Sequence, residues 1–76
     1  MIKIEQLIPL LKKGWVAMDS NGAWLYFFSK PVKDKKTRQW GFHKHGIHKL
    51  EVLSVAFDIA PADDWTKSLI KVKGND

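Results

Sequence analysis

The chain has 76 residues and a formal charge of +5, with 45% of its residues hydrophobic and 28% charged. This length predicts one domain, residues 1–76, and the composition excludes a disordered chain. The lack of cysteine excludes a disulfide scaffold and thiolate metal sites, and no apolar run reaches the roughly 18 to 20 residues of a membrane span. The N-terminus also lacks the apolar run of a signal peptide, so we expect a cytoplasmic protein that makes no membrane contact.

The first predicted element is a short amphipathic helix within residues 4–12. Its apolar residues recur at the spacing of one helical face: Ile4, Leu7, Ile8 and Leu11. Pro9 has no backbone N–H and fits a helix only in the first turn, so we expect the regular helix to begin near Glu5 or later. Gly14 follows as a natural C-terminal cap.

The clearest local signal is a β-hairpin in the stretch WVAMDSNGAWLYFF, residues 15–28. Asn21-Gly22 between two apolar runs is typical of a two-residue type I′ turn, which pairs Met18 with Leu25. In that register one sheet face carries Val16, Met18, Leu25 and Phe27. The other face carries Trp15, Ala17, Trp24, Tyr26 and Phe28. Both faces are apolar, so we expect the aromatic one to be closed by the C-terminal segment, buried in an oligomer, or partly exposed as a binding surface.

A basic segment and an acidic segment follow the hairpin. Residues 30–49 hold seven of the thirteen basic residues: Lys30, Lys33, Lys35, Lys36, Arg38, Lys44 and Lys49. Asp34 alone opposes them, whereas residues 51–65 hold four acids and no lysine or arginine. This asymmetry indicates either an anionic partner for the basic segment or a solvated loop that binds nothing.

Three further elements are predicted toward the C-terminus. Residues 39–42 predict a short third strand and residues 49–59 a fourth. The residues of the fourth strand that we expect to face the core are Leu53, Val55, Phe57 and Ile59. Residues 61–73 fit either a short helix or a final edge strand over 68–72, and both remain open. The sequence therefore predicts an α+β fold, in which an N-terminal helix packs on a three- to four-stranded, mainly antiparallel sheet and a short helical turn lies near the C-terminus.

Three histidines occur in the stretch WGFHKHGIHKL, residues 40–50: His43, His45 and His48. Imidazole is the commonest metal ligand, but a stable zinc site requires four ligands, or three and a water, and the neighbouring lysines repel a cation. We therefore predict no metal and no cofactor. Phosphate contact by Lys44 and protonated histidines, or a solvated loop, are the remaining alternatives.

Patterns typical of catalysis are missing from the sequence. Its serines lie in no nucleophile elbow, and neither a GxGxxG pattern nor a P-loop occurs. The adjacent Asp63 and Asp64 would point about 100° apart in a helix and to opposite faces in a strand, so they cannot act on one bond. We predict a protein that is not an enzyme.

Proteins bind nucleic acids through aromatic side chains, which stack on the bases, and through basic side chains, which contact the phosphates. The predicted ligand- or partner-binding residues are Trp24, Tyr26, Lys30, Lys33, Lys35, Lys36, Arg38, Trp40, His43, Lys44, His45 and His48. Alternatively, the tryptophans build the core of a small domain, or aromatic residues and arginine anchor a protein partner. A domain this small buries only about 60% of the surface that its unfolded chain exposes, so we also expect a homo-oligomer.

Several stretches together carry a resemblance that covers most of the chain: LLKKGW, AMDSNGAWLYFFSKP, a mid-chain tryptophan and PADDWTKSLIKV. Through them the chain resembles small phage- and prophage-encoded proteins of unassigned function. A weaker resemblance, through the helix leading into strands and the pair Asp64-Trp65, is to the Thoeris anti-defence family of phage proteins. That resemblance implies sequestration of a signalling nucleotide without cleavage, but it assigns no binding residue because the family's ligand-contact segments have no match.

These resemblances imply a counter-defence protein in the cytoplasm of the host cell. Its partner would be a host immune protein or an anionic ligand, which could be a nucleotide signal. The competing hypothesis is a nucleic-acid-binding module with a basic, aromatic surface.

Overall fold

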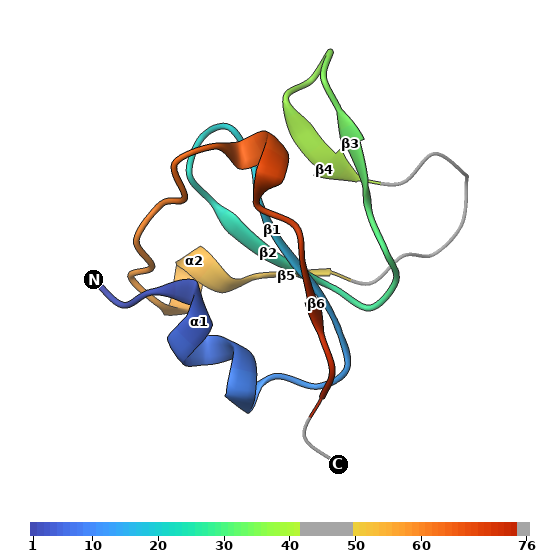
Figure 1. The fold of residues 1–76 in the computed structure, drawn as a ribbon. Helices are drawn as coiled ribbons and strands as arrows, with labels where there is room; N and C mark the ends of the chain where they lie inside the picture. The colour runs from blue at the N-terminus through green and yellow to red at the C-terminus, as the bar shows by residue number, and fades with distance from the viewer. Residues whose placement is uncertain (42–49, 75–76) are drawn as a thin grey trace.

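The computed structural model describes residues 1–41 and 50–74, and within them the chain forms two antiparallel sheets (Figure 1). The larger sheet has the strand order β5-β2-β1-β6, and the smaller one pairs β3 with β4. The strands are β1 Gly14–Met18, β2 Trp24–Phe27, β3 Val32–Asp34, β4 Gln39–Gly41, β5 Leu50–Val52 and β6 Ile70–Val72. The helical elements are α1 Ile4–Leu7, the 3-10 turn η1 Ile8–Leu10, α2 Leu53–Ala56 and the 3-10 turn η2 Trp65–Lys67. The predicted small α+β fold is confirmed, and none of these described helices is long and apolar enough to cross a membrane.

The N-terminal helix is shorter than predicted and begins earlier. α1 starts at Ile4, where the backbone N–H of Lys3 donates to Oε1 of Gln6 at 2.8 Å. The last α-helical hydrogen bond runs from the N–H of Ile8 to the carbonyl oxygen of Ile4, because Pro9 has no N–H to donate and the chain tightens into η1. α1 thus begins one residue before the predicted start near Glu5, and Pro9 lies in the first turn of η1 rather than in that of α1.

The β1–β2 hairpin forms where the sequence predicts it, but its register differs by one residue. The N–H of Gly22 donates to the carbonyl oxygen of Asp19 at 2.9 Å, and the N–H of Asp19 donates to that of Ala23 at 3.0 Å. Gly22 has a φ of 89°. This is the three-residue loop in which a type I turn is followed by a left-handed glycine, not the two-residue type I′ turn. Met18 therefore pairs with Trp24 and not with the residue after it.

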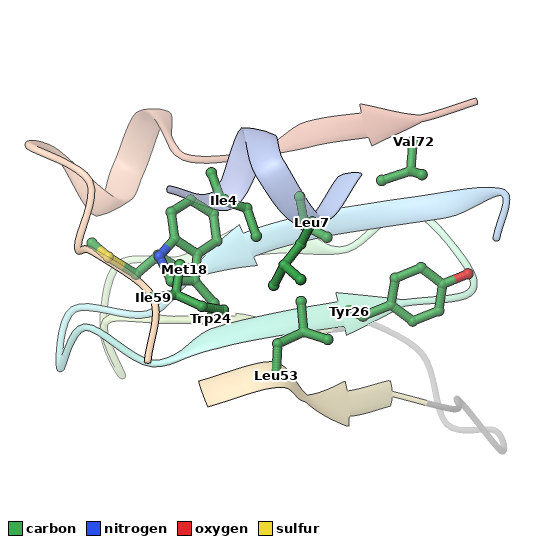
Figure 2. Packing of buried hydrophobic residues seen from close by; sticks show 9 residues of the cluster. Ile4, Leu7, Met18, Trp24, Tyr26, Leu53, Ile59 and Val72 are labelled. Carbon is green, nitrogen blue, oxygen red and sulfur yellow. The ribbon is translucent and has the colours of Figure 1, made fainter. Parts of the chain in front are cut away.

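The register decides which aromatic residues share a face of the four-stranded sheet, because a one-residue shift turns one strand's side chains to the other side. The face beneath α1 carries Val16, Met18, Trp24 and Tyr26. Figure 2 shows the last three of these packed with Ile4, Leu7, Leu53, Ile59 and Val72. The opposite face carries Trp15, Ala17, Leu25 and Phe27, and it is covered by Trp40 and by the partly buried Trp65 and Leu69. The single aromatic face of the predicted register was wrong, because the aromatic residues divide between two cores.

The predicted fourth strand is much shorter in the structure. β5 ends at Val52, and α2 begins at Leu53, whose side chain enters the core beneath α1. Within α2, the Ser54 hydroxyl accepts a hydrogen bond from the backbone N–H of Trp24 at 2.9 Å, which joins α2 to β2. The helical turn breaks the strand alternation. Of the four residues expected in the core, the structure buries Leu53 and Ile59 and exposes Val55 and Phe57.

The C-terminal segment contains a helical turn and then a strand, so each of the two alternatives describes part of it. Asp64 begins η2 by accepting a hydrogen bond from the N–H of Thr66 at 2.9 Å. After η2 the chain extends into β6, which pairs antiparallel with β1 and places Lys71 opposite Trp15. The C-terminal segment thereby becomes an edge of the four-stranded sheet.

Candidate anion-binding surface

A group of four basic residues lies on the β3–β4 hairpin, residues 32–41, which we call the basic hairpin. Its exposed cations are Lys33, Lys35, Lys36 and Arg38. The turn at residues 35–38 is closed by Asp34, whose Oδ1 accepts from the N–H groups of Lys36 at 2.9 Å and Thr37 at 3.4 Å. These bonds lower the pKa of the Asp34 carboxyl below its usual value. One carboxylate thus shapes the turn, and four cations around it leave the hairpin positively charged.

Arg38 occupies an unusual backbone position at the end of this turn. Its φ is 57°, and it is the one non-glycine residue with positive φ in the part of the chain that the structure describes. Side chains other than glycine, asparagine and aspartate rarely adopt this region. The carbonyl oxygen of Arg38 accepts a hydrogen bond from the N–H of Ser20 at 3.2 Å. The turn of the basic hairpin is therefore attached to the loop between β1 and β2.

Trp40 anchors the basic hairpin to the rest of the molecule. Its backbone N–H donates to Oδ1 of the buried Asp19 at 2.8 Å, and its indole Nε1–H donates to the carbonyl oxygen of Trp65 at 3.0 Å. The two indole rings also meet edge-on, with centroids 6.4 Å apart. Burial raises the pKa of the Asp19 carboxyl, and the bond from Trp40 opposes that shift. A small, charged hairpin is in this way fixed to the apolar core.

The basic hairpin also lines a concave surface of about 590 Å³, to which every residue from Val32 to Gly41 except Arg38 contributes. A second concavity of about 420 Å³ lies between α1 and residues 60–63. Its lining contains the acids Glu5 and Asp63 with a single lysine, so the hairpin concavity is the better match for an anion.

A second positive site surrounds Trp15, which is partly exposed in a strand whose other residues are buried. The Nζ of Lys30 lies over the indole ring at 5.4 Å from its centroid, and that of Lys71 at 5.9 Å. The predicted binding residues include Lys30 but neither Trp15 nor Lys71. Trp15 and Lys71 come together only through the pairing of β1 with β6, which no local pattern in the sequence indicates.

The structure brings together only part of the predicted binding set. The four hairpin cations share one surface, and Lys30 lies beside Trp15. The predicted stacking residues are buried instead: Trp24 is 2% exposed, Tyr26 4% and Trp40 9%. Trp24 and Tyr26 use their polar atoms inside the protein, through an indole bond to the carbonyl of Ala60 and a hydroxyl bond to that of Lys13. His43, Lys44, His45 and His48 lie outside the described residues.

Within residues 1–41 and 50–74, no three histidine or acidic side chains are grouped so that they could hold a metal ion. Of the two adjacent aspartates of the C-terminal segment, Asp64 has a structural role. Asp64 accepts from both the hydroxyl and the N–H of Thr66, which lowers the pKa of its carboxyl. Asp64 therefore caps η2.

Strand β5 forms the other edge of the four-stranded sheet. Leu50 and Val52 lie on the Phe27 side of this edge and are 44% and 42% exposed. An exposed apolar edge is a common route to self-association. The homo-oligomer nevertheless stays a prediction.

Comparison of the chain with protein-family models, with curated proteins and with solved structures found no significant match.

Proposed function

We propose that this protein acts by binding rather than by catalysis, and that its ligand is a nucleic acid whose phosphates contact the basic hairpin. The observation that supports this proposal is the presence of four exposed cations on one anchored hairpin, residues 32–41. Cations held together on one element attract a polyanion more strongly than the same charges scattered over a surface.

The charges of the basic hairpin are available to a ligand. None of its four cations forms a salt bridge with a carboxylate of the described residues. The carboxylate of Asp34 is bonded to the turn and attracts Lys36, and that of Asp64 attracts Lys33, in each case as the smallest of the effects that lower the pKa of the carboxyl. Phosphates could therefore approach Lys35 and Lys36 without breaking a salt bridge to a described carboxylate.

The test is the salt dependence of oligonucleotide binding in matched variants. We expect the double variant Lys35→Gln/Lys36→Gln to bind a labelled single strand of about twelve nucleotides more weakly than the native chain. Between roughly 50 and 200 mM salt, the logarithm of the association constant decreases linearly with the logarithm of the salt concentration. The magnitude of this negative slope should be smaller by about 1.4 when two phosphate contacts are lost. Fluorescence anisotropy measures both quantities.

The matched control is Lys3→Gln/Lys12→Gln, which removes the same charge beside α1 and η1, away from the basic hairpin (Figure 1). It should retain the native slope, because these lysines would contact no phosphate. Equal losses in the two double variants would show a nonspecific effect of net charge and contradict the proposal. A native chain that binds no oligonucleotide would contradict it as well.

The counter-defence role in the host cytoplasm remains a prediction of the resemblance. A nucleotide signal carries the same phosphate chemistry, so the basic hairpin suits it too. Native mass spectrometry of protein purified from its host would test this role, because a sequestered nucleotide would be released unaltered on denaturation and a host immune protein would copurify.

A further inference from the structure

Trp15 differs from the other three tryptophans in its surroundings. Trp24 and Trp40 are buried in the two cores, and Trp65 packs against both. Trp15 lies on the sheet face opposite α1, next to Ala17 and Phe27, and it remains partly exposed. Lysine ammonium groups from two separate segments lie over its ring: Lys30 from the β2–β3 connection and Lys71 from β6.

These two lysines have no acidic partner in the described structure. Neither Lys30 nor Lys71 forms a salt bridge with a carboxylate among residues 1–41 and 50–74. Their positive charges are instead held against the face of an indole. A cation at an exposed aromatic face is bound only weakly, so either ammonium can move aside to meet an anion.

We propose that Trp15 is a stacking site for an unpaired nucleobase, and that Lys30 and Lys71 contact the phosphates on either side of that base. The inference rests on the proposed function and names its ligand class as single-stranded nucleic acid. Every base presents a π-face to an aromatic ring, whereas bases within a duplex already stack on one another. A flanking pair of cations gives the backbone of a stacked nucleotide two charged contacts.

The Trp15 site is continuous with the basic hairpin through a short stretch of chain. Lys30 is followed by the fully buried Pro31 and then by β3, which begins at Val32 and carries Lys33. Three residues of extended chain span at most about 11 Å, so the Cα atoms of Lys30 and Lys33 lie within that distance of each other. One bound strand could therefore stack a base on Trp15 and reach the hairpin with its neighbouring phosphates.

The test compares single-strand with duplex binding in variants of Trp15. Trp15→Leu keeps an apolar side chain against Ala17 and Phe27 but removes the stacking ring. We expect it to weaken binding of a thymidine single strand of about twelve nucleotides by roughly five- to 150-fold. The ratio of single-strand to duplex affinity should fall with it. Trp15→Phe should lose less, because it retains a smaller ring.

The matched control is Phe28→Leu, which removes an exposed aromatic ring that packs edge-on against Tyr26 on the other face of the sheet. This variant should bind the single strand with the native Kd. Thermal unfolding of each variant establishes that it is folded. If Trp15→Leu does not fold, the double variant Lys30→Gln/Lys71→Gln serves instead, and it should reduce the salt slope for the single strand by about 1.4.

The outcomes separate the inference from the proposed function. A folded Trp15→Leu that binds the single strand with the native Kd overturns the stacking site, and so does an equal loss of single-strand and duplex affinity. If the Lys35→Gln/Lys36→Gln variant still loses affinity in that case, the basic hairpin remains the binding surface. If the native chain binds neither form of nucleic acid, both proposals fail.

Discussion

The four-stranded sheet and the basic hairpin are built on different principles. All four residues of β2 and four of the five in β1 are buried, and both faces of the sheet are covered by apolar side chains. In β3 and β4, by contrast, Trp40 is the one buried residue, and the exposed positions are mostly charged. The four-stranded sheet gains its stability from burial, whereas the hairpin depends on one indole and on hydrogen bonds to the β1–β2 loop and to η2. Charge can therefore be concentrated on the hairpin without being placed in the core.

The largest expected effect comes from Trp40→Ala, which removes the anchor of the hairpin. Loss of a buried tryptophan lowers the free energy of unfolding by about 3–5 kcal/mol. Hydrogen exchange should show that amides of β3 and β4 lose protection before those of β1 and β2. Trp24→Ala, the matched change in the core sheet, should instead expose all strands together. Uniform loss of protection in both variants would mean that the hairpin and the sheet unfold as one unit.

A smaller effect is expected from Asp19→Ala, which leaves the N–H of Trp40 without its acceptor. An unsatisfied buried donor costs about 1–3 kcal/mol of the free energy of unfolding. Asp19→Asn retains an oxygen in the same position and should lose much less. Urea unfolding of the two variants measures the difference. Equal losses would assign the role of Asp19 to packing rather than to this hydrogen bond.

Asp19→Asn also isolates a pH effect. Burial raises the pKa of Asp19 above 3.8, so the folded state retains a proton at pH values where the unfolded state has released it. The free energy of unfolding contributed by Asp19 therefore decreases as pH rises above the pKa of the unfolded state. The lowered pKa values of Asp34 and Asp64 act with the opposite sign, because their stabilising contribution is lost as pH falls. The Tm of Asp19→Asn relative to the native protein should therefore increase as pH rises through and above the ordinary titration range of an aspartate. A constant difference would contradict this assignment.

The smallest effect is expected from Arg38→Gly, and it separates hairpin stability from hairpin charge. Glycine adopts the positive φ of this position without strain, so the free energy of unfolding should rise by about 0.5–1 kcal/mol. Oligonucleotide affinity should fall at the same time, because one cation is lost. A hairpin that is both destabilised and weaker in binding would show that the arginine side chain supports the turn.

Much of the fold follows from local signals in the sequence. The Asn21-Gly22 pair predicted the β1–β2 hairpin, and the apolar spacing around Ile4 and Leu7 predicted the helix. The register of the hairpin did not follow, because Gly22 fits both a two-residue and a three-residue loop. Because the register differs by one residue, Trp24 and Tyr26 lie in the core beneath α1 and not on the predicted binding face.

The candidate site was predicted less completely than the fold. The charge of the basic hairpin was visible in the sequence as a run of lysines, since charge is a property of composition, and the strand predicted over 39–42 corresponds to β4; strand β3 was not predicted. The Trp15 site was not, because Lys30 and Lys71 approach the same indole from segments far apart in the chain. The strand predicted after the histidine segment failed at Leu53, where packing beneath α1 favours a helical turn over continued alternation.

The sequence by itself determined the elements that depend on neighbouring residues: the position of the first hairpin, the amphipathic helix, the basic segment and the small α+β class. These properties act over a few residues, through turn geometry, side-chain period and charge. Only the tertiary structure decided which tryptophans are buried and that two lysines lie over the ring of Trp15. Those properties depend on strand register and on the pairing of β1 with β6, and the physical cause in both cases is contact between residues that are distant along the chain.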